Sequence, residues 1–152
     1  MGCFMALIDL PLMPQSGALI GIDPGSKTLG IAASDGLRLI ASPVTTIQRS
    51  KLAKDLSALF ALYDERACVG LIVGLPLNMD GSEGPRAQSA RALVRNILKE
   101  RDVPIALQDE RLSSAQATRA MLEADLSRAR RAEIIDASAA SVILQTALDR
   151  LA

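Results

Sequence analysis

Residues 17–36 read GALIGIDPGSKTLGIAASDG, and most of the predicted sheet follows from this stretch. Three apolar runs in it and directly after it predict three strands, over 18–22, 29–33 and 37–47. A turn containing Gly25 separates the first two runs, and Asp35-Gly36 predicts a hairpin before the third. Strands joined by short turns are antiparallel, so we expect three antiparallel strands in succession.

The rest of the chain alternates helical and strand patterns. Leucine and aromatic side chains recur at helical spacing after Ser50, which we interpret as the N-cap of the first helix. The predicted elements are a helix over 51–66, a strand over 69–75, a helix over 86–101, a strand over 104–108, and helices over 114–124 and 133–151. Because a helix returns the chain between the last two strands, we expect strands one, four and five to be parallel. The sequence therefore predicts an α/β fold, with a five-stranded mixed sheet in the order 3-2-1-4-5 flanked by helices.

The composition is that of one ordinary globular domain. The chain has 152 residues, of which 49% are hydrophobic, and its 17 basic side chains balance 17 acidic ones. We expect the domain to span 17–152 and residues 1–16 to form an N-terminal extension lying on it. Because Pro11 and Pro14 interrupt the apolar run of this extension, we expect neither a signal peptide nor a membrane span. With no net charge, affinity for nucleic acid has to come from a local basic patch.

The residue types that are missing exclude several kinds of chemistry. The chain contains no histidine, which removes histidine-based triads, histidine zinc sites and an imidazole general base. Cys3 and Cys68 form no CxxC motif, so we interpret them as small apolar side chains in a protein of the reducing cytoplasm. Phe60 and Tyr63 lie one helical turn apart, which favours core packing over a base-stacking platform. Carboxylates remain as the candidates for catalysis.

Carboxylates fall near the carboxyl ends of the parallel strands, where open α/β sheets collect their ligands. Asp23 ends the first strand, and Asp109 and Glu110 end the fifth. Only one of these last two can face a given site, because neighbouring strand residues point to opposite faces. Gly74 has no side chain to block the gap between the first and fifth strands, and Glu110 has one more methylene with which to reach across it. Asp136 belongs to the last predicted helix, among alanines that would let that helix lie close to the sheet.

Three crowded carboxylates would repel one another unless a cation lies between them. Oxygen ligands suit Mg²⁺ or Mn²⁺. Two such ions would activate a water and stabilise the leaving oxygen in phosphodiester cleavage. The sequence therefore predicts a divalent-metal site at this edge of the sheet.

Each acid also has a structural interpretation. Asp23 could stabilise the turn at Pro24-Gly25 through its side chain. Glu110 could pair with Arg111 or a neighbouring basic residue, and Asp136 could be a helix-surface acid or pair with Arg130. The metal hypothesis depends on the three acids meeting at one edge.

Basic residues near the acids are predicted to contact nucleic-acid phosphates. Lys27 lies beside Asp23, Arg111 lies beside Glu110, and Arg130 and Arg131 belong to a cluster just before the last helix. For that cluster, a solvated helix terminus is the alternative interpretation.

Four motifs in order along the chain resemble the YqgF/RuvX family, from about residue 17 to the C-terminus. They are GIDPGSKTLG at 21–30, VGLPLNMDG at 73–81, DERLS at 109–113 and DASAA at 136–140. The family is described as pre-16S rRNA nucleases that are similar to Holliday-junction resolvases, and it has an RNase H-like fold. The resemblance implies that Asp23, Glu110 and Asp136 are the metal-binding catalytic acids.

The resemblance also implies a cytoplasmic nuclease whose partner is nucleic acid. The expected substrate is pre-rRNA, at the 5′ end of the small-subunit rRNA, with branched DNA as the alternative and ribosomal particles as a further partner. No membrane partner is expected, and the sequence leaves open whether the protein is a monomer or a homodimer.

Two other functions compete with this one. Residues 21–28 match the Walker A spacing except at Ser26, but a predicted strand rather than a helix follows, which rejects a P-loop. The same loop also resembles the phosphate loop of ATP-binding relatives in the actin and sugar-kinase class, which close two lobes over the nucleotide. The second competitor is a non-catalytic nucleic-acid-binding or ribosome-binding module that keeps the fold without the chemistry.

Overall fold

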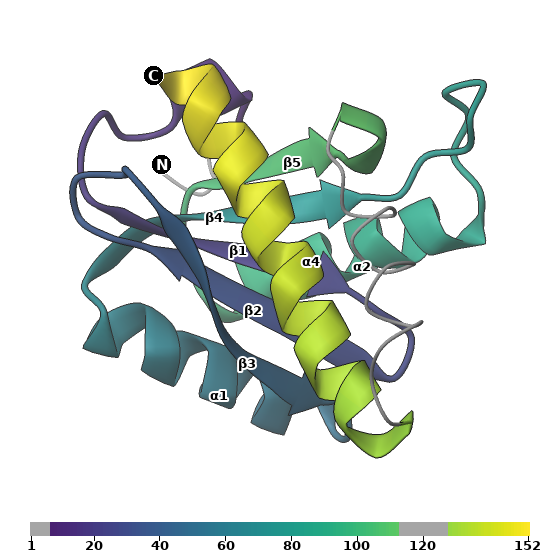
Figure 1. The fold of residues 1–152 in the computed structure, drawn as a ribbon. Coiled ribbons are helices and arrows are strands. Elements are labelled where there is room, and N and C mark those ends of the chain that lie inside the picture. Colours follow the sequence, from purple (N-terminus) through teal and green to yellow (C-terminus); the bar gives the residue numbers. More distant parts are fainter. Residues whose placement is uncertain (1–6, 113–127) are drawn as a thin grey trace.

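A computed structural model describes residues 7–112 and 128–152, and for residue 112 and residues 128–136 it describes only the backbone. The elements are η2 (Leu10–Leu12), β1 (Ala18–Pro24), β2 (Thr28–Ser34), β3 (Ala41–Gln48), α1 (Leu52–Glu65), β4 (Cys68–Leu75), α2 (Pro85–Glu100), β5 (Ile105–Asp109), η3 (Glu110–Leu112) and α4 (Arg128–Leu151). The predicted helix over 114–124 lies outside the described residues. Figure 1 shows the arrangement.

The five strands form one mixed sheet in the order β3-β2-β1-β4-β5, which confirms the predicted order. Strand β1 pairs antiparallel with β2 and parallel with β4, and β4 pairs parallel with β5. The carboxyl ends of β1, β4 and β5 therefore meet at one edge of the sheet, as the sequence analysis expected.

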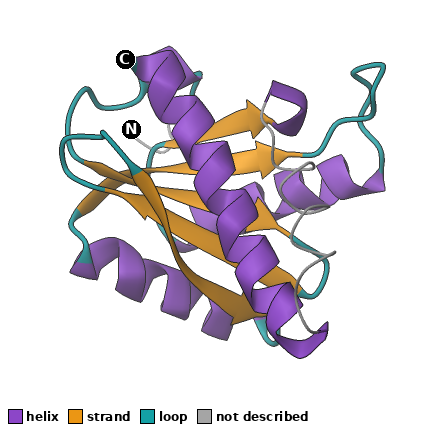
Figure 2. Ribbon diagram, viewed as in Figure 1, coloured by secondary structure: helices purple, strands orange, loops and turns teal. Residues whose placement is uncertain are grey.

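Helices cover both faces of this sheet (Figure 2). On one face, α1 and α2 bury large side chains, including Phe60 and Tyr63, against β1 and β4. On the other face, α4 crosses the strands diagonally (Figure 1) and buries alanines together with Ile143 and Leu144. The aromatic pair is thus part of the core, as predicted.

Helix α4 lies very close to β1 because Gly21 has no side chain. A Cβ built on Gly21 would lie 2.7 Å from Leu144 Cβ and 3.0 Å from the carbonyl oxygen of Ala140. Such distances are too short for real carbon atoms in van der Waals contact. The small residues that follow Asp136 in the sequence therefore belong to α4, the helix that packs directly on the backbone of β1.

The segment before β1 lies along the outer edge of β5. Ile8 donates its backbone N–H to the carbonyl oxygen of Ile105 at 2.8 Å, and Leu10 and Met13 are buried in the cluster beneath α4. The end of the predicted N-terminal extension is thus packed onto the sheet.

The predicted N-cap at Ser50 is wrong. Helix α1 begins at Leu52 with Lys51 as its N-cap residue, and no side chain caps it. Ser50 instead donates its backbone N–H and its hydroxyl to the carboxylate of Asp55, a buried residue of the first turn. The Asp55 carboxylate, from the first turn of the helix, accepts these hydrogen bonds. Ser50 is therefore a donor and not the N-cap.

The predicted third strand begins four residues too early. Asp35 accepts the backbone N–H groups of Leu39 and Ile40, and Arg38 has a φ of 59°. These features make residues 35–40 a longer turn, and β3 starts only at Ala41. The last helix is longer than predicted, since α4 starts at Arg128 rather than at residue 133.

Within the described residues, none of the helices combines the length and the apolar character that crossing a membrane requires.

Candidate active site

Asp23 is a buried carboxylate near the carboxyl end of β1, with an exposed fraction of 3%. Residues two apart on a strand share a face, so Asp23 lies on the same face as Gly21, against which α4 packs. It pairs with Gly30 of β2 inside the ladder, so it belongs to the strand rather than to the turn that follows. The strand ladder therefore fixes the position of this buried acid.

Glu110 brings a second buried carboxylate to the same place. It is the first residue of η3, directly after β5, and only 2% of it is exposed. A Cβ built on Gly74 would lie 2.8 Å from Glu110 Oε1. The carboxylate therefore fills the space that the missing side chain leaves on β4, which confirms that Gly74 keeps the gap open.

Asp23 lies next to this space. Ile22 pairs with Val73 in the parallel ladder, so the following residues, Asp23 and Gly74, stand side by side on neighbouring strands about 4.8 Å apart. Both lie on the face covered by α4, because Ile143 Cδ1 of that helix is 2.8 Å from the Cβ built on Gly74. The structure thus brings together two of the three predicted acids.

Asp136 belongs to α4, and the structure describes only its backbone. It precedes Ala140 by four residues and Ile143 by seven, and these spacings share one helix face. Both of those residues contact the sheet, and the first turns of α4 lie on the side toward which β4 and β5 point (Figure 1). The spacing agrees with the sequence prediction for Asp136, but its side chain lies outside the described part of the structure, so its place beside the two buried acids remains a prediction.

The donor chemistry of this region fits a hard divalent cation. Asp23 and Glu110 offer carboxylate oxygens, the ligands preferred by Mg²⁺ and Mn²⁺. Among the side chains that the structure describes, no group of three or more histidine, cysteine, aspartate or glutamate residues is gathered. A three-carboxylate site thus depends on Asp136, the one predicted ligand whose side chain is not described.

Asp109 and Glu110 have separate environments, as the alternation of strand residues requires. The Arg111 guanidinium donates to the Asp109 carboxylate, with Nη2 2.8 Å from Oδ2. These hydrogen bonds hold the pKa of Asp109 below its usual value. The described ion pair of Arg111 is thus with the preceding aspartate.

Arg111 also holds the loop that follows β4. Its Nη1 donates to the carbonyl oxygen of Met79 at 3.3 Å, and its guanidinium lies 3.5 Å from the Cβ that Gly81 would carry. This arginine joins the ends of β4 and β5 at the edge where the acids lie. A phosphate contact by Arg111 remains a prediction.

The other predicted phosphate contacts lie around the same edge. Lys27 is exposed in the turn between β1 and β2. Arg130 and Arg131 belong to the first turns of α4, and their side chains lie outside the described residues. Their roles remain predictions.

Gln108 is a polar residue of this region that the sequence analysis overlooked. It is fully buried, pairs with Gly74 in the β4–β5 ladder, and accepts a hydrogen bond from Arg150 Nη1 at 2.9 Å. A signal was present, because a glutamine two residues before Glu110 in an otherwise apolar run shares the face of the candidate acids. The Gln108–Arg150 hydrogen bond joins the end of α4 to β5, the strand that Glu110 directly follows.

Comparison with known proteins agrees with the resemblance and with the fold. The model of the family described as RuvX: Holliday junction resolvase matches residues 17–150. A relative from Cereibacter sphaeroides (strain KD131) is 56% identical over 142 residues, covering 93% of this chain and 89% of the relative. One from Rhodobacter capsulatus is 59% identical over 140 residues, covering 92% and 88%. Both carry the name "Putative pre-16S rRNA nuclease".

A solved structure of T. thermophilus RuvC in complex with a Holliday junction substrate has the same fold. Its TM-score is 0.56 at 16% identity, and the match covers 88% of this chain and 95% of that one. The RNase H-like fold is therefore confirmed. Because the family model spans nearly the whole chain and the relatives are more than half identical to it, the chain belongs to the RuvX family.

Proposed function

We propose that this protein is a metal-dependent nuclease that cleaves phosphodiester bonds at the 5′ end of pre-16S rRNA. The observation that carries the proposal is the pair of buried carboxylates, Asp23 and Glu110, which converge beside Gly74 beneath α4. Carboxylate oxygens gathered in one place are the donors that a hard divalent cation prefers. Membership in the RuvX family and the names of the relatives support an rRNA substrate.

Asp23 and Glu110 would hold Mg²⁺ or Mn²⁺, with Asp136 of α4 as the third ligand. When bound, such ions activate the attacking water and offset the negative charge on the leaving oxygen. The chain's own contribution is orientation, because Asp23 stands near the end of β1, Glu110 begins η3 directly after β5, and Asp136 belongs to α4.

The remaining predicted groups would act on the nucleic-acid backbone. Lys27, Arg130 and Arg131 would bind phosphates next to the one that is cleaved. Arg111, held by Asp109, would keep the loop after β4 in place at the rim of the site. We place this activity in the cytoplasm, on precursor rRNA that is free or assembled in ribosomal particles.

The test is a cleavage assay with a labelled RNA that spans the 5′ boundary of the mature 16S rRNA. We expect cleavage with Mn²⁺ or Mg²⁺ and none with EDTA. The variants Asp23→Asn and Glu110→Gln should each lower the rate by about 100-fold or more, because each loses a metal ligand. The variant Asp64→Asn, which changes an exposed carboxylate paired with Arg101 near the end of α1, should retain the rate of the unmodified chain. Undiminished cleavage by folded Asp23→Asn protein would overturn the proposal.

Branched DNA is the second candidate substrate, because the family model describes a Holliday junction resolvase. A four-way junction assayed beside the RNA under the same conditions separates the two. A higher rate on the junction would assign the protein to DNA resolution and leave the proposed acids unchanged.

A further inference from the structure

A cavity lies on the other side of the strand end that carries Asp23. It has a volume of about 330 Å³ and is lined by Pro24, Gly25, Ser26, Pro85, Arg86 and Ser89. The first three residues form the end of β1 and the turn after it, and the last three belong to the start of α2. Neighbouring strand residues point to opposite faces of the sheet. Asp23 faces α4, so Pro24 and the cavity beside it lie on the side of α2.

We propose that this cavity binds one phosphate group of a nucleic-acid strand, with Arg86 as the principal contact. The ligand class rests on the proposed nuclease function, and the cavity itself rests on its own residues. A strand whose cleaved phosphate lies at Asp23 and Glu110 would pass over the edge of the sheet and bring a neighbouring phosphate to the cavity.

The charge of the cavity favours an anion. Its lining contains one arginine, two serine hydroxyls and no carboxylate. Within the described residues, the ion pairs engage Arg91 with Glu83, Arg101 with Asp64 and Arg111 with Asp109, which leaves the guanidinium of Arg86 available. Guanidinium groups bind phosphates through two parallel hydrogen bonds.

The walls of the cavity are held before any ligand arrives. Arg49 donates its Nη1 to the carbonyl oxygen of Gly25 at 2.7 Å and its backbone N–H to the carbonyl oxygen of Lys27 at 2.9 Å. Gly25 in turn donates its N–H to the carbonyl oxygen of Thr28 at 2.9 Å. A site whose main-chain wall is already fixed loses less conformational entropy when a ligand binds.

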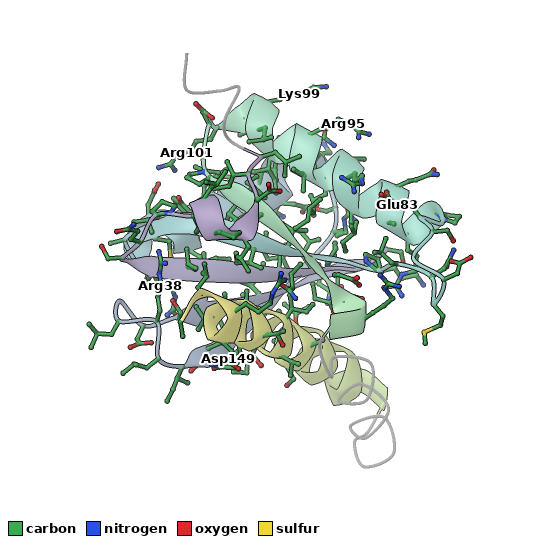
Figure 3. The ribbon with its side chains drawn as sticks, turned by 90° about the horizontal axis from the view of Figure 1, so that it is seen from above. Arg38, Glu83, Arg95, Lys99, Arg101 and Asp149 are labelled. Carbon is green, nitrogen blue, oxygen red and sulfur yellow. The ribbon has the colours of Figure 1, made fainter. Side chains whose placement is uncertain are left out.

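The test measures RNA binding without cleavage, by fluorescence anisotropy of a labelled single-stranded RNA in EDTA. We expect Arg86→Ala to weaken binding about tenfold and to make the dependence of log K on log salt shallower by about 0.7, as for one lost phosphate contact. The matched control is Arg95→Ala, which removes an exposed arginine of the same helix (Figure 3) about 14 Å further along. It should bind within twofold of the unmodified chain.

A second pair of variants tests the cavity rather than the net charge. Ser89→Glu adds a carboxylate to the lining and should weaken binding more than Gln88→Glu, which adds the same charge to the neighbouring exposed position outside the lining. Circular dichroism confirms that each variant is folded.

The outcomes separate this inference from the proposed function. Equal weakening by Arg86→Ala and Arg95→Ala, or no RNA binding by the unmodified chain in EDTA, would overturn the phosphate site. If Arg86→Ala alone weakens binding while the unmodified chain cleaves no RNA with Mn²⁺, the phosphate site stands and the nuclease proposal fails.

Discussion

The two faces of the sheet are packed differently. One face mainly stabilises the fold, and the other positions the candidate acids. Large side chains such as Leu59, Phe60 and Leu93 fill the face under α1 and α2. Glycine and alanine make the closest contacts under α4, where Gly21 and Gly74 admit the helix and a carboxylate to the strand backbone. The first face buries apolar area and stabilises the fold. The second face buries smaller side chains, so α4 and the Glu110 carboxylate lie close to the strand backbone. This close approach brings acids from distant parts of the chain together.

The largest expected effect is on stability, and it belongs to the first face. Leu59 is fully buried in α1, so Leu59→Ala should lower the free energy of unfolding by about 2–5 kcal/mol. The cleavage rate per folded molecule should stay unchanged, because this face lies opposite the acids. Urea unfolding measures the free energy of unfolding. The cleavage assay, divided by the concentration of folded protein, measures the rate per folded molecule. Leu52→Ala, at the exposed start of the same helix, is the control and should change stability by less than about 0.5 kcal/mol. A large loss of rate in folded Leu59→Ala protein would argue against separate roles for the two faces.

The next effect belongs to the second face and falls on activity. A Cβ at Gly74 would lie 2.8 Å from both Glu110 Oε1 and Ile143 Cδ1, so Gly74→Ala should displace the carboxylate. Displacement by about 1 Å lowers the cleavage rate on the order of 100-fold. The control is Gly36→Ala, because a Cβ there meets no atom within 4 Å. Equal cleavage rates for Gly74→Ala and Gly36→Ala would show that Glu110 does not need the space left by the missing side chain of Gly74.

The smallest effect concerns the neighbouring acid, Asp109, which is half-buried and paired with Arg111. The hydrogen bonds from Arg111 lower the pKa of Asp109, so the charged carboxylate stabilises the folded state at any pH above its unfolded pKa of about 3.9. As the pH falls through the lowered pKa, the proton binds and this stabilisation is lost. The unfolding free energies of the unmodified chain and Asp109→Asn should therefore differ at neutral pH and converge as the pH falls below the lowered pKa. A difference that persists in acid would show that the pair does not act through its charge.

Much of the fold was predictable because it depends on local pattern. Apolar runs and turn residues predicted the strand order, and the position of Asp23 at a strand end indicated the edge at which the candidate site lies. The role of Gly74 was also predictable, because a strand glycine beside a gap leaves room for a neighbouring side chain.

The errors arose where contacts between side chains decide the local structure. Ser50 has the residue type of an N-cap, but the carboxylate of Asp55 in the first turn takes its N–H. The turn after β2 is longer than Asp35-Gly36 suggested because the Asp35 carboxylate accepts two backbone N–H groups. The hydrogen bond from Arg150 to Gln108 joins residues 42 positions apart, and no local sequence pattern predicts such a contact.

The central claim is that Asp23, Glu110 and Asp136 form one divalent-metal site, and Mn²⁺ binding tests it most directly. Electron paramagnetic resonance reports free Mn²⁺ during titration of the unmodified chain and of Asp23→Asn, Glu110→Gln, Asp136→Asn and the control Asp109→Asn. We predict that each of the first three substitutions weakens binding about tenfold or more, while the control binds as tightly as the unmodified chain. Equal binding by all five proteins would contradict the account.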